Sequence, residues 1–109
     1  IALAGQGRTA EAIERYGQAL RLRPAYAEAL NNLGLALAAM KRLPEAIERF
    51  EQAVRVNPDF AQAHNNLGVA YAQVNRVPEA IEQFEQAVRL DPGFEQAKRN
   101  LRSLTEGRR

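Results

Sequence analysis

The chain is built on a 34-residue repeat, and this period constrains its fold more than any other feature of the sequence. Placed in register, residues 27–60 and 61–94 are identical at 22 of 34 positions. Self-similarity at this spacing is typical of stacked helical arrays, in which each unit buries its apolar face against its neighbours. Arrays of this kind usually present a surface to a partner, and the sequence does not name that partner.

Prolines recur where helices are expected to end and to begin. Pro24, Pro58 and Pro92 are 34 residues apart, and because proline cannot continue a helix they mark the joints between repeats. Pro44 and Pro78 suit the first turn of a helix, where the missing N–H loses no hydrogen bond. Together with apolar residues spaced by three and four, these signals predict helices over 9–22, 25–40, 44–56, 60–74, 78–90 and 94–106.

Small residues predict close contact between the two helices of each repeat. Gly34 and Gly68 fall midway along the first helices, and the alanines expected to face them from the second helices are Ala46, Ala53, Ala80 and Ala87. Acidic residues four positions before a basic one, such as Glu45 and Arg49, predict ion pairs on solvated outer faces.

Composition favours one domain and excludes several function classes. The 109 residues carry 15 basic and 13 acidic side chains, and a net charge of +2 is too small to argue for nucleic acid. No apolar run approaches the roughly 20 residues of a membrane span, and no signal-peptide pattern is present. Without cysteine the redox compartment stays open, and a cytoplasmic location is favoured. Because the chain begins at Ile1, we expect it to be part of a longer protein.

The repeated residues resemble the tetratricopeptide repeat, which has the same 34-residue length. The residues that carry the resemblance are Leu33, Gly34, Ala46, Phe50, Ala53 and Pro58, and again Leu67, Gly68, Tyr71, Ala80, Phe84, Ala87 and Pro92. The chain departs from the usual pattern where Leu30 and His64 replace an aromatic residue and Leu37 replaces a tyrosine. The resemblance implies an all-α fold, a right-handed superhelical array of antiparallel helix pairs whose first helices line a concave groove.

The repeat register predicts a single domain over residues 1–109. It would comprise a partial repeat at 1–26, full repeats at 27–60 and 61–94, and a C-terminal capping helix with a basic tail at 95–109. The basic residues of that last segment are expected to give a terminal helix an outer face that meets water rather than another repeat. Binding of nucleic acid is not expected, since no aromatic residue accompanies them. They are Lys98, Arg99, Arg102, Arg108 and Arg109.

Asparagine recurs at one position of three successive first helices, as Asn32, Asn66 and Asn100. A carboxamide both donates and accepts, so such a series can pair with the main chain of an extended peptide whatever its sequence. The series resembles the asparagine ladder of the tetratricopeptide superhelix in O-linked N-acetylglucosamine transferase. Asn31 and Asn65 directly precede Asn32 and Asn66 and are expected to add to the same binding surface. The alternative is that the Asn-Asn pair is a feature of the helix surface that is inherited with the repeat. Other residues expected on the groove are Glu28, Gln62, Leu35 and Val69.

No residue pattern indicates catalysis, a cofactor or a metal site. His64 is the only histidine and is expected to have a packing role. Relatives that clamp an acidic carboxyl terminus use lysine and arginine on these first helices. Here the matching positions hold Asn31, Leu35, Asn66, Gln96 and Asn100, so no preference for an acidic chain terminus is expected.

The sequence therefore predicts a non-enzymatic protein–protein interaction module that binds a peptide or partner segment. One alternative is a scaffold unit that self-associates through an open N-terminal edge, where Ile13, Tyr16 and Leu20 lack part of their cover. Another is a regulatory segment of a larger enzyme such as a glycosyltransferase. Neither membrane nor nucleic acid is an expected partner.

Overall fold

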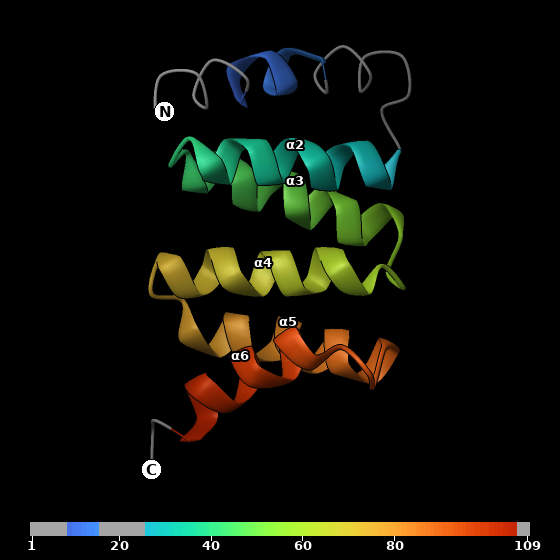
Figure 1. The fold of residues 1–109 in the computed structure, drawn as a ribbon, viewed down its shortest axis with the longest axis vertical. Helices are drawn as coiled ribbons and strands as arrows, with labels where there is room; N and C mark the ends of the chain where they lie inside the picture. The colour runs from blue at the N-terminus through green and yellow to red at the C-terminus, as the bar shows by residue number, and fades with distance from the viewer. Residues whose placement is uncertain (1–8, 16–25, 107–109) are drawn as a thin grey trace. The chain divides into compact units, whose positions relative to one another are not determined.

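The computed structural model describes residues 9–15 and 26–106, and all the regular secondary structure in these ranges is helical. Residues 9–15 are helical, and they are followed by α2 (Ala27–Ala39), α3 (Leu43–Val56), α4 (Ala61–Gln73), α5 (Val77–Leu90) and α6 (Glu95–Glu106), as Figure 1 shows. None of the helices in the described ranges has the length and apolar character needed to cross a membrane.

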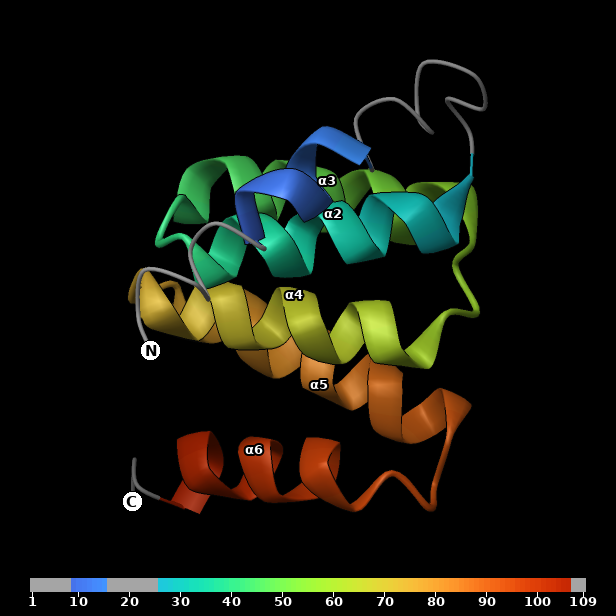
Figure 2. The same ribbon diagram turned by 45° about the horizontal axis from the view of Figure 1, so that its top comes forward.

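The chain divides into two compact units, Ile1–Pro58 and Asp59–Arg109. In the first unit α2 and α3 pack together and run in opposite directions. In the second, α5 packs against both α4 and α6, and successive helices again reverse direction (Figure 2).

Proline fixes the helix boundaries as predicted. Helices α3 and α5 begin one residue before Pro44 and Pro78, so each proline lies in a first turn where no N–H is required. The same helices end two residues before Pro58 and Pro92. Each predicted boundary from residue 26 onward agrees with the structure to within two residues. The prediction for 16–22, and Pro24 with it, lies outside the described residues.

Each helix pair closes around a glycine and a phenylalanine. Gly34 of α2 lies so close to the Phe50 ring of α3 that a Cβ at this position would be 2.5 Å from Cε1. In the second unit, a Cβ at Gly68 would be 2.6 Å from Phe84 Cε1. The four alanines expected to face the first helices are completely buried, namely Ala46, Ala53, Ala80 and Ala87. The predicted close approach is therefore confirmed.

Helices α2 and α4 end in left-handed residues that are not glycine. Lys41 has φ 63° and Asn75 has φ 64°. The Arg42 N–H then donates to the carbonyl of Leu37 at 2.9 Å, and the Arg76 N–H donates to the carbonyl of Tyr71 at 2.8 Å. The same two carbonyls also accept longer bonds from the N–H groups of Met40 and Val74, at 3.1 and 3.2 Å, so each last turn is closed by two donors.

Surface ion pairs form at the starts of helices. Arg42 bonds Glu45 at 2.6 Å and Arg76 bonds Glu79 at 2.8 Å, each across three residues. The Arg42 hydrogen bond holds the pKa of the Glu45 carboxyl below its usual value, and Arg76 does the same for the pKa of Glu79. The direct partner of Glu45 is therefore Arg42, whereas Arg49, expected from the spacing, adds a weaker attraction at longer range.

Candidate functional site

Consecutive asparagines on the first helices have different surroundings. Asn31 and Asn65 are each only 4% exposed, whereas Asn32 and Asn66 are half-buried and reach the surface. Neighbouring residues on a helix point about 100° apart, since 3.6 residues make one turn, so the two members of a pair face different environments. Asn31 and Asn65 therefore lie in the interior rather than on the binding surface expected of them.

The two buried asparagines are satisfied by hydrogen bonds. No buried side-chain nitrogen or oxygen among the described residues lacks a partner. Asn65 accepts a bond from Asn100, whose Nδ2 lies 3.1 Å from Asn65 Oδ1. This bond joins α4 to α6 across 35 positions of sequence and fixes the direction of the Asn100 amide group.

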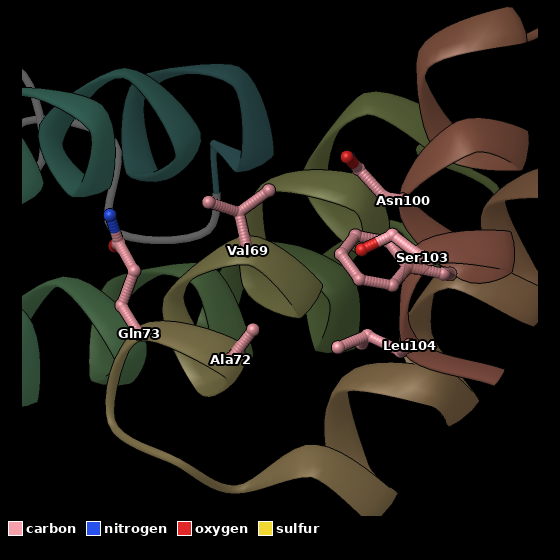
Figure 3. A pocket seen from close by; sticks show the side chains of 7 residues that line it. Val69, Ala72, Gln73, Asn100, Ser103 and Leu104 are labelled. Carbon is pink, nitrogen blue, oxygen red and sulfur yellow. The ribbon is translucent and has the colours of Figure 1, made fainter. Parts of the chain in front are cut away.

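A pocket of about 250 Å³ opens beside this bond, between α4 and α6. Figure 3 shows side chains of α4 on one side of it and side chains of α6 on the other. Helix α4 contributes Val69, Ala72 and Gln73, α5 contributes Phe84, and α6 contributes Asn100, Ser103 and Leu104. None of these seven side chains carries a charge.

Two of the pocket residues, Val69 and Asn100, were predicted from the sequence as site residues, and the others were not. Ala72, Gln73, Ser103 and Leu104 lie three or four positions after those two, which places them one turn further along the same helical faces. That spacing is the signal by which the sequence could have indicated them.

The remaining predicted site residues lie at the surface of their units. Glu28 accepts a 2.7 Å hydrogen bond from the Tyr26 hydroxyl, and Gln62 is exposed at the start of α4. Leu35 on α2 is 45% exposed. Tyr16 and Leu20, on which the predicted N-terminal edge depends, lie outside the described residues, and Ile13 is half-buried.

His64 packs inside the second unit. It is 8% exposed, and its Nδ1 lies 2.8 Å from Gln83 Oε1 on α5. Over residues 9–15 and 26–106, no group of three or more His, Cys, Asp or Glu side chains could hold a metal ion.

Comparison with protein-family models decides what kind of repeat this is. A model described as tetratricopeptide repeat matches residues 39–93, and a second one, described as TPR repeat, matches residues 2–41. The chain belongs to the tetratricopeptide-repeat (TPR) family. The all-α TPR fold expected from the resemblance is thus confirmed. No curated protein matches the chain.

Solved structures with the same fold include several TPR domains. The crystal structure of MamA is 29% identical with a TM-score of 0.87, and the match covers 92% of this chain and 58% of MamA. The Sgt2 TPR domain from Aspergillus fumigatus is 27% identical with a TM-score of 0.88, covering 97% of this chain and 72% of that one. The second TPR domain of human RPAP3 was solved in complex with the HSP70 peptide SGPTIEEVD. It is 25% identical with a TM-score of 0.86, and the match covers 95% of this chain and 87% of the RPAP3 chain.

The charged residues of the last TPR helix stand outside the pocket. Lys98 bonds Glu95 at 2.9 Å, and this hydrogen bond lowers the pKa of the Glu95 carboxyl. Lys98 and Arg102 occupy the repeat positions that hold His64 and Gly68 in α4. Arg102 is exposed and Lys98 is half-buried, so α6 presents a polar face where α4 packs against its second helix.

Proposed function

We propose that this TPR chain is a non-catalytic module that binds an extended peptide segment of another protein. Main-chain contacts would come from Asn32, Asn66 and Asn100. The observation that supports it most is that Asn32 and Asn66, at the same position of two first helices, both reach the surface while their neighbours Asn31 and Asn65 are buried.

The chemistry of these side chains suits a peptide main chain. A carboxamide offers a donor and an acceptor, which are the two groups that each peptide unit presents in return. A single neutral hydrogen bond of this kind contributes about 0.5–1.5 kcal/mol, so each asparagine is worth about two- to tenfold in affinity. Binding through several weak contacts of this type tolerates many side-chain sequences.

We further propose that the module does not prefer an acidic carboxyl terminus, although RPAP3 was solved with such a peptide. The positions that would clamp a carboxylate carry no cation, and one of them, Asn31, is buried. A peptide such as SGPTIEEVD should therefore bind equally well with a free and with an amidated terminus. A strong loss of affinity on amidation would contradict this proposal.

The test is an array of immobilised extended peptides, probed with the 109-residue chain and its variants. Asn66→Ala and Asn32→Ala should each weaken binding about two- to tenfold while the circular dichroism spectrum stays that of the parent chain. Gln86→Ala is the matched control, because it truncates an amide that lies on α5 rather than on a first helix and that bonds Arg89 of the same helix, so it should bind like the parent.

Asn100→Ala needs a second measurement, since it also leaves the buried Asn65 oxygen without its partner. Its unfolding midpoint must therefore be recorded beside its affinity. If no peptide on the array binds, or if the asparagine variants bind like the parent, the proposal fails. Self-association, or a regulatory role within a larger enzyme, would then account for the module better.

A further inference from the structure

We propose that the pocket between α4 and α6 holds one leucine- or methionine-sized apolar side chain of the bound peptide. The pocket is formed by Val69, Ala72, Gln73, Phe84, Asn100, Ser103 and Leu104. The inference rests on the proposed function, because it assigns a residue preference to a peptide otherwise held by its main chain.

The volume of the pocket fits one side chain. Sites for drug-sized ligands enclose roughly 300–1,000 Å³, and an apolar cavity of roughly 150 Å³ binds benzene. At about 250 Å³ the pocket is large enough for an unbranched or γ-branched aliphatic group.

The lining selects against charge. Val69, Ala72, Phe84 and Leu104 supply apolar surface, Gln73, Asn100 and Ser103 are polar but neutral, and none of the seven lining residues carries a charge. A carboxylate or ammonium group placed there would lose hydration without gaining a counter-charge. An apolar group, by contrast, exchanges water for hydrocarbon contact.

Asn100 belongs to both parts of the proposed site. It lines the pocket, and it is one of the three asparagines proposed to bind the peptide main chain. Its Nδ2 already donates to Asn65 Oδ1 at 3.1 Å, which holds the amide in one orientation. The carbonyl oxygen on the other side of that amide remains the natural acceptor for a peptide N–H. A peptide residue that donates to this oxygen would have its own side chain beside the pocket, so one residue can satisfy both contacts.

The fixed orientation also favours binding energetically. A side chain that is already ordered loses less conformational entropy when a ligand arrives. Asn65, buried in α4, therefore contributes by holding Asn100 in place without touching the peptide itself.

The first experiment tests the pocket without a peptide. The probe is N-acetyl-leucine N-methylamide, titrated into the ¹⁵N-labelled 109-residue chain. We expect saturable shifts at the amides of Ala72, Ser103 and Leu104 and at the Asn100 side-chain NH₂. The aspartate analogue of the probe should give no such shifts. Equal shifts with both probes, or none with either, would overturn the pocket assignment.

The second experiment uses the peptides that bind in the array, with each position replaced in turn by leucine and by aspartate. One position should lose about tenfold or more in affinity with aspartate. Ser103→Phe, at an exposed position on the pocket wall, should abolish that preference by filling the space. Thr105→Phe, at an exposed position on the same helix outside the lining, is the matched control and should keep it.

The outcomes separate the two proposals. Peptides that bind through the asparagines, accept aspartate at every position and ignore Ser103→Phe would overturn the pocket subsite and leave the proposed function standing. Failure of all peptides to bind would overturn the proposed function, and with it the peptide residue assigned to the pocket.

Discussion

Gly68→Ala adds one methyl group where α4 meets α5, and the structure indicates how much that should cost. The new Cβ would lie 2.6 Å from Phe84 Cε1, 2.8 Å from Cδ1 and 2.9 Å from Cζ. Ordinary contact begins near 3.4 Å, so the ring would have to retreat by about 0.8 Å. Phe84 is 2% exposed and enclosed by its neighbours, so this movement disturbs other packing.

Two effects of opposite sign decide the stability of Gly68→Ala. Alanine is favoured over glycine in a helix interior by about 0.8–1 kcal/mol. Overpacking a closed core costs about 1–3 kcal/mol, and three ring atoms at once are affected here. The difference is a net destabilisation of about 0–2 kcal/mol, and the three ring contacts favour the upper half of that range.

The assay is urea unfolding of the 109-residue chain, followed by circular dichroism, in a double-mutant cycle with Phe84→Leu. Leucine lacks the Cε1 and Cζ atoms that the added methyl would meet, so the steric cost should shrink, and Gly68→Ala should become neutral or stabilising by up to about 1 kcal/mol. The control is Gly93→Ala, whose Cβ would have its nearest neighbour at 3.5 Å, an ordinary contact, and should change stability by less than about 1 kcal/mol. If Gly68→Ala stabilises the parent chain, or costs as much in the Phe84→Leu variant as in the parent, the steric reasoning is refuted.

Two further predictions concern the turns after the first helices and the ion pairs that follow them. Lys41→Gly should raise the urea midpoint, because the left-handed conformation at φ 63° costs an ordinary residue about 1–2 kcal/mol and costs glycine almost nothing. Asn75→Gly should gain less, since asparagine tolerates this conformation, and a larger gain at Asn75 would contradict the explanation. In Arg42→Gln the pKa of Glu45 should rise toward that of an ordinary carboxyl, as measured by NMR titration of its side-chain carbon, because the lowered pKa depends first on the Arg42 hydrogen bond. Because the pKa of Glu45 is lowered in the folded state, the pair stabilises the fold at pH values above the unfolded-state pKa. This contribution is lost as the pH falls through the folded-state pKa, so the stabilities of parent and variant should converge in acid.

Helix positions could be predicted from this sequence because proline and the repeat period act locally. Pro44 and Pro78 each determine the start of a helix through their own geometry, whatever the rest of the chain does. The turn after α2 was not predicted, since the chain leaves the helix through a left-handed Lys41, a residue with no preference for that conformation.

The site was only partly predictable because it depends on the rotation of a helix and on contacts distant in sequence. In an Asn-Asn pair either member could face outward, and packing of the large apolar residues decided that Asn31 is buried and Asn32 is not. The bond between Asn65 and Asn100 forms only once α6 has packed, and so does the pocket beside it. Likewise Glu45 had basic residues on either side within one turn, and side-chain geometry selected Arg42.

The glycine–phenylalanine contact that closes each helix pair joins residues only 16 positions apart, Gly34 with Phe50 and Gly68 with Phe84. Bringing such near neighbours together requires closing a short loop, and the entropy lost in doing so is small. Folding rates fall as contacts become more distant in sequence, so a chain held in this way should fold quickly. An added repeat would lengthen the molecule without lengthening the loops that must close. Arrays of this unit can therefore grow by duplication without acquiring contacts that are more distant in sequence.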